Sequence, residues 1–427
     1  MALRLGDSVH TAAAGIINAH TGVEVTPDTV FQIGSIGKVF TATLVMQLVD
    51  DHLVDIERPV RTYLPEFTVG DVDASQRITV RNLLMHTSGM DGDFLPPDDP
   101  WGASSQAYLQ KISLLPQLHP VGAYMTYCNS GYVVAGRIAE VLRRKPWAEL
   151  VMERICRPLG IKNAYAMPTE GIRFRSAIGH LPDPKAPRRF ILAPVSYLPQ
   201  SIAAAGSALC MSADELLKFS TMHFSGGLQG GQAIISHGSA MAMQEQVVAL
   251  PEFSRSGYTH MGLGWLIGRH SDRLLFGHDG STCGQYSYMQ CMPDRGISFA
   301  LLTNSPSTSL INELKPLIHG SIAGLPALND PEPNPVHFDC DRFIGVYENA
   351  ATRIRVTAVG SDLHFETESR GSGTARQRGR LLPHSENCFQ LEADDPALRG
   401  KITFLGDRNG RPEYFRLGLR MARRIVS

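Results

Sequence analysis

The sequence lacks the features that mark several specialised classes of protein. Its 427 residues contain no apolar run approaching the ~18 residues of a membrane-spanning helix. The formal net charge is −1, so we expect no overall attraction to nucleic acid or to an anionic membrane, and the basic segments 185–190 and 420–427 are interpreted as solvated edges. The N-terminal residues lack the basic and then apolar layout of a secretory signal. We therefore expect a cytoplasmic protein, with the periplasm or secretion as the alternative if the true start lies upstream.

Cysteine is sparse and scattered. The seven cysteines are odd in number, and they form neither a CxxC pair nor a Cys/His cluster with the spacing of metal ligands. The sequence therefore supports neither a disulfide framework nor a structural zinc site. The cysteines are at positions 128, 156, 210, 283, 291, 340 and 388.

The composition that is present is that of an ordinary globular protein. Apolar residues make up 43% and charged residues 19%, with 40 glycines and 27 prolines that indicate many turns. A chain of this length exceeds one modest core, so two domains of unequal size are expected. We find no internal repeat and no low-complexity tract.

Hydrophobic periodicity predicts an α/β region followed by an all-β region. Strands are expected over 8–17 and 28–34, and helices over 35–51, 79–86, 130–144 and 212–224, the last with Ser212 as N-cap. After residue 258 short strands separated by turns predict an antiparallel meander, closed by a helix over 309–322.

A proline-rich stretch predicts the boundary between two domains. Four prolines lie within 326–336, which favours a stiff linker. Beyond it every segment has the length of a strand and no helix intervenes, as in a small barrel or sandwich. We predict one domain over 1–325 and a second over 337–427.

The stretch "FQIGSIGKVFTATLVMQLV" contains the first candidate for chemistry. Ser35 and Lys38 are three residues apart, a spacing that places them on one face of a helix. The apolar flanks leave Lys38 few places to be solvated, and desolvation lowers the pKa of a lysine toward that of a useful base. A serine hydroxyl becomes a good nucleophile when a neighbour accepts its proton, so the pair predicts an activated serine.

Two further stretches carry polar groups suited to the same chemistry. In "YCNSGY", Tyr127 can carry a proton if a cation holds it, and Asn129 can hydrogen-bond a substrate amide or Lys38. In "GHDGSTCG", His278 precedes a strand edge at 280–281 that can offer a backbone N–H to an oxyanion.

These three motifs, in this order, resemble those of the serine β-lactamase/penicillin-binding-protein-like superfamily. Ser35–Lys38 matches S-x-x-K, Tyr127–Asn129 matches Y-x-N, and His278–Gly280 matches the K-T-G or H-x-G motif. The branch with class C β-lactamases, S12-type peptidases and related esterases is the most similar. The resemblance covers about residues 8–322, and the tail resembles the lipocalin-like domain of some members. It implies an α/β fold with an antiparallel sheet flanked by helices, an all-helical subdomain carrying Tyr127, and a small all-β barrel.

The resemblance also implies roles for individual residues. The catalytic side chains would be those of Ser35, Lys38, Tyr127 and His278. Ser35 would attack the substrate carbonyl while Lys38 and Tyr127 share its proton. The substrate-binding residues are Asn129, Gly280 and Ser281, with the backbone N–H groups of Ser35 and Ser281 holding the oxyanion. Tyr127 would protonate the leaving group and later activate water, and neither a metal nor an organic cofactor takes part.

Two departures from the family pattern matter. His278 stands where β-lactamases have lysine, and a histidine is only partly cationic near neutral pH, which argues against an efficient β-lactamase. Members of the family normally begin with an amphipathic helix that covers the sheet. This sequence starts at or near the first strand, so that helix is either missing or encoded upstream.

The function predicted from these observations is hydrolysis of an amide bond in a small or modified peptide through an acyl-serine. The alternatives are a carboxylesterase for short acyl esters, a peptide-cyclising thioesterase with an amine as acceptor, and a β-lactam-acylated sensor with little turnover. The expected partner is a small molecule or short peptide, and the barrel would either cover the cleft or hold a homodimer.

Other polar residues are interpreted as structural. The stretch "LLMHTSGM", which contains His86, is interpreted as a turn, and Cys128 as a small packed residue. Trp265 is assigned to the core, and His180, His223 and His260 lack the spacing of metal ligands.

Overall fold

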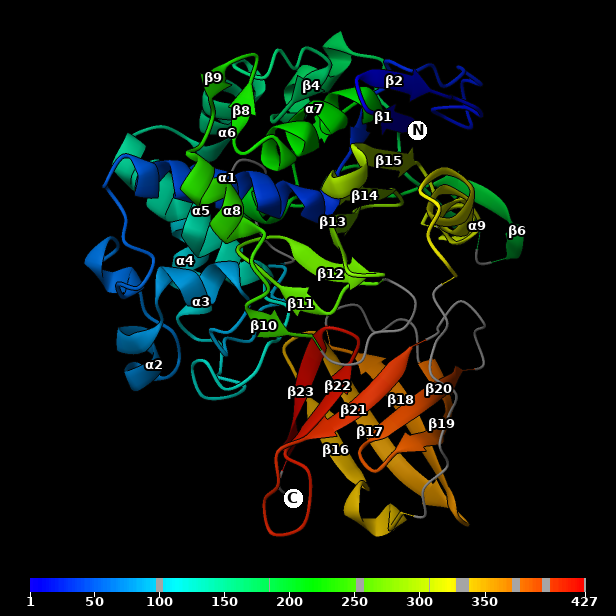
Figure 1. Cartoon of the computed structure of the whole chain (residues 1–427). Helices are drawn as coiled ribbons and strands as arrows, with labels where there is room; N and C mark the ends of the chain where they lie inside the picture. The colour runs from blue at the N-terminus through cyan, green and yellow to red at the C-terminus, as the bar shows by residue number, and fades with distance from the viewer. Residues whose placement is uncertain are drawn as a thin grey trace.

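The computed structural model describes residues 1–96, 103–183, 185–250, 257–306, 308–327, 338–370, 377–393 and 400–425. Figure 1 shows a mixed α/β body with an eight-stranded barrel packed against one end of it. The predicted fold class is therefore confirmed. The predicted linker 326–336 lies almost wholly outside the described residues. Among those residues, none of the helices combines the length and the apolar character needed to span a bilayer.

The body is built on an antiparallel sheet with the strand order β10-β11-β12-β13-β14-β15-β1-β2. Strands β11 to β15 form the meander expected after residue 258, and the short strand β10 precedes them. The strands are β1 (Ala2–Leu5), β2 (Ser8–Thr11), β10 (Val248–Ala249), β11 (His260–Met261), β12 (Leu266–His270), β13 (Arg273–Ser281), β14 (Tyr286–Met292) and β15 (Ile297–Thr303).

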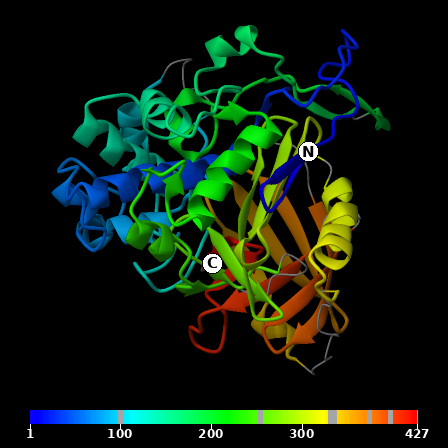
Figure 2. The same cartoon turned by 45° about the horizontal axis from the view of Figure 1, so that its top comes forward.

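Helices cover both faces of this sheet, which explains why its central strands are apolar on both sides. On one face α1 (Gly37–Asp50), α7 (Ala213–Phe224) and α8 (His237–Met243) form a single core with the sheet. The other face packs against α9 (Ser309–Leu317) and the π-helical turn Ile318–Ile322 that continues it. Figure 2 shows α9 and α1 on opposite sides of the sheet.

The remaining helices form a region beside α1, away from the sheet (Figure 1). Its centre is α5, which contacts α1, α3, α4 and the 3₁₀ helix η5. The elements are α2 (Val72–Arg77), α3 (Val80–Leu84), α4 (Ser105–Ile112), α5 (Asn129–Arg143), α6 (Trp147–Val151) with the π-helical turn Met152–Cys156, and η5 (Gln200–Ala205).

Short strands and 3₁₀ turns connect these layers. The small pairings are β3 (Phe31–Gln32) and β4 (Ala164–Tyr165) on β7 (Cys210–Met211), β5 (His180–Asp183) with β6 (Ala186–Leu192), and β8 (Leu228–Gln229) with β9 (Gln232–Ala233). The other 3₁₀ turns are η1 (Gly34–Ile36), Val60–Thr62, Pro168–Arg173, Pro293–Arg295 and Cys340–Arg342.

The C-terminal strands close into a barrel, one of the two arrangements (barrel or sandwich) that their spacing predicted. Its interior is filled by aromatic rings in mutual contact, among them those of Phe343, Tyr347, Phe389 and Phe404. The strands are β16 (Gly345–Glu348), β17 (Thr352–Val359), β18 (Asp362–Ser369), β19 (Gln377–Ser385), β20 (Cys388–Ala393), β21 (Lys401–Leu405), β22 (Tyr414–Leu417) and β23 (Arg420–Ile425).

Several predicted boundaries are wrong near the N-terminus. The strand predicted over 8–17 ends at Thr11, and it forms a hairpin with β1, which was not predicted. The strand predicted over 28–34 is reduced to two residues because Gly34 turns the chain at a φ of +53°.

The predicted helices are mostly present with shifted ends. The helix predicted to open at Ser35 begins at Gly37, after the 3₁₀ turn that holds the serine. The helix over 79–86 is α3, capped by Thr79 through a capping box. Ser212 is at the N-cap position of α7 as predicted, but it makes no side-chain capping bond, and its hydroxyl donates to Asp214 instead.

Candidate functional site

Ser35 lies in the tight turn η1, directly before α1. Two glycines allow neighbouring backbone to press against this turn. A Cβ on Gly280 would lie 2.7 Å from the Ser35 nitrogen, and a Cβ on Gly206 would lie 3.0 Å from the Ser35 Cα. The serine is therefore fixed between β13 on one side and the end of η5 on the other.

Lys38 is fully buried beneath this serine, as predicted. Its ammonium donates to Ser35 Oγ at 3.1 Å and to the Ala205 carbonyl at 2.5 Å. Burial, aided by the positive charge of Arg420, lowers the pKa of Lys38 to about 7. A lysine with such a pKa is largely neutral slightly above neutral pH, so it can take the proton of Ser35.

Tyr127 is the third group at this point. It precedes Cys128, the N-cap of α5, and its ring centroid is 4.9 Å from Lys38 Nζ. Burial raises the pKa of Tyr127, while a hydrogen bond with Ser35 acts in the opposite direction. The phenol therefore keeps its proton at neutral pH and can act as an acid.

His278 and Gly280 lie on one face of β13, toward Ser35. The ring of His278 is buried, with its centroid 6.3 Å from that of Tyr127. Burial lowers the pKa of His278, so the imidazole is neutral at neutral pH. Its Nδ1 is 2.6 Å from the Asp279 carbonyl and donates to it, which leaves Nε2 as a buried acceptor without a partner among the described residues.

The backbone nitrogens of Ser35 and Ser281, the two predicted oxyanion donors, each lie against a glycine of the other segment. A Cβ on Gly34 would fall 2.7 Å from the nitrogen of Ser281, as the Cβ of Gly280 would from that of Ser35. The hydroxyl of Ser287 links the two segments, because it donates to the Ile33 carbonyl at 2.7 Å and its oxygen lies 3.3 Å from the Gly280 carbonyl oxygen. Both glycines are required because a Cβ at either position would lie within 3 Å of backbone atoms of the other segment.

Asn129, the first residue of α5, is tied to an acidic residue that sequence reasoning missed. Its Nδ2 donates to Asp93 Oδ1 at 2.9 Å, and the other oxygen of Asp93 accepts from Nε of Arg420. Arg420 comes from the barrel, and its guanidinium carbon is 5.0 Å from the ring centroid of Tyr127. Arg420 and Arg423 are both exposed, in line with the interpretation of 420–427 as a solvated edge, but Arg420 is also paired with Asp93.

The barrel contacts the segment that carries the tyrosine through its backbone. At the tip of the β22–β23 hairpin, the Leu419 carbonyl accepts the Tyr127 N–H at 2.7 Å. The Met421 N–H donates to the Thr126 hydroxyl at 3.1 Å. The same hairpin tip lies beside β10 (Figure 1), and Leu419 packs against a cluster that contains Met261 of β11 and Leu266 of β12. The barrel thus forms one wall of the site.

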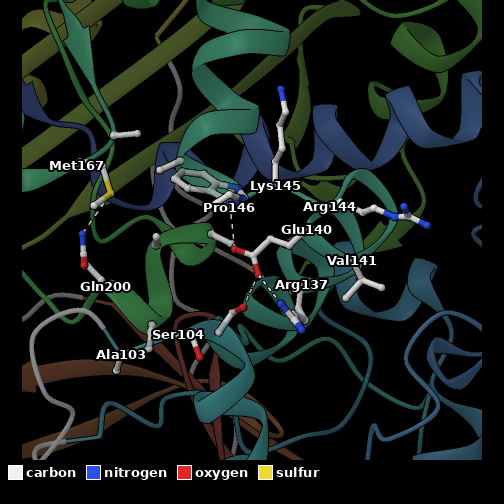
Figure 3. A pocket seen from close by; sticks show the side chains of 18 residues that line it. Ala103, Ser104, Arg137, Glu140, Val141, Arg144, Lys145, Pro146, Met167 and Gln200 are labelled. Atoms are coloured by element: carbon white, nitrogen blue, oxygen red, sulfur yellow. Dashed lines mark hydrogen bonds and ion pairs between the residues drawn. The ribbon is translucent and has the colours of Figure 1, made fainter.

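A well-defined pocket lies away from the predicted site residues. It measures about 560 Å³ and lies between the second half of α5, the start of α6 and η5 (Figure 3). None of the predicted site residues lines it, and Glu140 at its centre is already used, accepting the Trp147 N–H at 2.9 Å and the Ser105 hydroxyl. A small cavity of about 10 Å³, room for about one water, lies instead at the seam beside Tyr127, Asp93 and Arg420.

Neither thiol chemistry at Cys128 nor metal binding is supported at this site. Burial raises the pKa of the Cys128 thiol to about 12, which makes it a poor nucleophile. Among the described residues no group of three or more His, Cys, Asp and Glu side chains is arranged to hold a metal ion.

The fold and the Ser–Lys–Tyr geometry define a serine hydrolase of the β-lactamase type. The "Beta-lactamase" family model matches residues 1–319, and penicillin-binding protein 4 of Amycolatopsis lactamdurans is 34% identical over 357 residues, which is 82% of this chain and 92% of that protein. The chain therefore belongs to the β-lactamase/penicillin-binding-protein-like family and is a serine hydrolase.

Solved structures are similar to this chain as well, and in one of them the similarity includes the barrel. SurE superposes over 99% of this chain and 94% of its own, with a TM-score of 0.78 and 26% identity. A D-amino acid amidase from Ochrobactrum anthropi SV3 covers 76% of this chain and 92% of its own, with a TM-score of 0.64 and 25% identity.

Proposed function

We propose that this protein hydrolyses an amide bond of a small or modified peptide through an acyl intermediate on Ser35. The observation that carries the proposal is the contact of Lys38 with both Ser35 and the ring of Tyr127, together with the opposite pKa shifts of Lys38 and Tyr127. Burial lowers the pKa of Lys38 to about 7 and raises that of Tyr127 above its usual value. One group is then a base and the other an acid at the same pH, which is what acyl transfer from an amide requires, because its nitrogen must be protonated to leave as an amine.

The reaction follows from these positions. Lys38 accepts the proton of Ser35, whose Oγ attacks the carbonyl carbon. The N–H groups of Ser35 and Ser281 stabilise the oxyanion, each contributing about 10²–10³ in rate. Tyr127 gives its proton to the leaving nitrogen and is reprotonated from the Lys38 ammonium. Water then attacks the acyl-serine: Tyr127 takes its proton while passing its own proton to Lys38, and Ser35 leaves with the proton that the Lys38 ammonium returns to its Oγ.

The charges around the site support a substrate other than a β-lactam. The buried His278 is neutral and supplies no permanent cation on β13. Arg420, a cation close to the ring of Tyr127, is already paired with Asp93 at the wall formed by the barrel. A wall at this position favours small substrates or the ends of modified peptides. Two structural neighbours fit this class, since one is a D-amino acid amidase and SurE has been solved with D-Leu.

The test begins with the nucleophile. We expect the intact mass of the wild-type protein to increase by one adduct on exposure to a fluorophosphonate, and that of Ser35→Ala to stay unchanged. Ser281→Ala is the matched control and should label normally, because only its backbone N–H is assigned a role. A panel of D- and L-amino acid amides, short peptides, esters and β-lactams then tests the bond. Preferred turnover of esters or β-lactams over every amide would contradict the proposal.

A further inference from the structure

His86 is a buried residue that the mechanism above does not use. It follows α3 in the stretch "LLMHTSGM", its side chain is fully buried, and its backbone has a φ of +57°. Residues other than glycine are uncommon in this left-handed region. We propose that His86 is a positioning residue for Tyr127, acting as a neutral imidazole that fixes both the backbone and the ring of the tyrosine. The inference rests on the proposed function, in which Tyr127 transfers the proton.

His86 holds the chain on both sides of the tyrosine. Its carbonyl accepts the N–H of Thr126 at 2.9 Å, and its Nδ1 accepts the N–H of Cys128, also at 2.9 Å. The N–H between these two, that of Tyr127 itself, donates to the Leu419 carbonyl of the barrel. Three consecutive N–H groups are therefore fixed, two of them by one residue.

The ring of His86 also packs on the ring of the tyrosine. Their centroids are 4.4 Å apart with a tilt of 31°, and Tyr132 contacts the imidazole with a centroid distance of 5.1 Å. Lys38 Nζ is also close to both tyrosine rings. The imidazole thus limits rotation of Tyr127 in a site where the phenol must reach both Ser35 and the leaving group.

The hydrogen bonds determine the proton position on this imidazole. Because Nδ1 accepts the Cys128 N–H, the proton of the neutral ring is on Nε2, which is buried and has no partner among the described residues. Burial, with smaller effects from Lys38 and His278, keeps the pKa of His86 well below its usual value. A neutral ring here leaves the proton transfer to Lys38 and Tyr127.

Two substitutions separate the backbone contact from the ring contact. His86→Asn places Oδ1 near the position of Nδ1 and tolerates a positive φ, so it keeps the acceptor for Cys128 and loses the ring. His86→Leu loses both. The matched control is His223→Asn, which truncates a histidine that is equally buried but packs beside Phe219 and Trp265 in the core.

The readout is the rate at which a fluorophosphonate modifies Ser35, which depends on Tyr127 through the hydrogen bond between Tyr127 and Ser35 and requires no knowledge of the substrate. A wrong substrate class would therefore leave this comparison intact. For a misplaced acid–base group we expect a loss of about 10²-fold in His86→Leu and a smaller loss in His86→Asn, per folded molecule. Circular dichroism gives the folded fraction, and His223→Asn should label at the wild-type rate.

A double-mutant cycle with Tyr127→Phe decides whether His86 acts through the tyrosine. If it does, His86→Asn and His86→Leu will cause no further loss in the Tyr127→Phe background, because the group they position is already gone. Equal losses in both backgrounds, or a loss that only follows the unfolded fraction as in a structural turn, would overturn the inference.

Discussion

Lys38 is the residue whose surroundings differ most from those of an ordinary lysine. It is fully buried, it is held by Ser35 and Ala205, and its pKa is lowered to about 7. The neutral form is the base, so the rate of Ser35 acylation should rise with pH through about 7 and level off above it. Lys38→Arg, which stays protonated, should lose about 10²–10⁴ in rate.

This prediction is checked with the pH–rate profile of fluorophosphonate labelling between pH 5 and 9. Lys145→Arg is the control, because Lys145 is an exposed lysine paired with Glu153 on the surface. A profile that is flat across this range in the wild-type protein would show that Lys38 is not the base.

Gly280 permits the close approach of β13 to the nucleophile. A Cβ at this position would lie 2.1 Å from the Ile33 carbonyl oxygen and 2.7 Å from the Ser35 nitrogen, both backbone atoms that cannot easily move. Gly280→Ala should therefore separate the two oxyanion donors and reduce turnover by about 10²-fold or more. Steady-state kinetics beside Ser281→Ala, which should keep near wild-type activity, measures the effect. Wild-type activity of a folded Gly280→Ala would exclude the assigned donors.

At the scale of elements, the β22–β23 hairpin explains what the sequence could predict about the site and what it could not. Ser35, Lys38 and Tyr127 were predictable because each lies in a short motif whose neighbours act with it. Arg420 and Asp93 were not, because their relation depends on a contact between residues 327 positions apart. In one sequence an arginine that opens a basic strand looks like any solvated charge.

The hairpin predicts that a barrel residue affects catalysis. Arg420→Gln would remove the cation near Tyr127 and release Asp93, which also holds Asn129. Because half of the Arg420 side chain is open to solvent, we expect a moderate effect, on the order of 10-fold in kcat/KM, with little change in stability. Arg423→Gln, on the exposed face of the same strand, is the control. Equal kinetics for the two variants would show that Arg420 is not part of the site.

At the scale of the whole molecule, the fold was predictable where pattern and local chemistry agree, as in the meander and the barrel. The N-terminal β1–β2 hairpin was missed because β1 has only four residues and pairs with β15, almost three hundred residues away. The docking of the barrel was equally beyond reach, since it depends on backbone groups such as the Tyr127 N–H and the Leu419 carbonyl. Hydrogen bonds between backbone groups place little constraint on residue type, so a single sequence does not reveal them.

The seam between barrel and body contains an acidic group that should make their docking depend on pH. Asp91 is 2% exposed and accepts the N–H of Ala350, in the barrel, at 2.6 Å. Burial raises its pKa from 3.8 to about 6, with that hydrogen bond acting against the rise. The folded protein thus binds this proton more tightly than the unfolded chain does. The stabilisation from Asp91 is present below about pH 4 and is lost as the pH rises to about 6.

Asp91→Asn should therefore stabilise the protein at pH 7.5 and have much less effect at pH 4.5, because its amide oxygen still accepts from Ala350 while the buried charge is gone. The gain at pH 7.5 is at most about 3 kcal/mol for a shift of about two pKa units. Urea unfolding at both pH values measures it. Asp93→Asn is the comparison: Asp93 is paired with Arg420, so removing its charge should destabilise the seam. If Asp91→Asn lowers stability at pH 7.5, the carboxylate is favourable there and the seam is not pH-sensitive through this group.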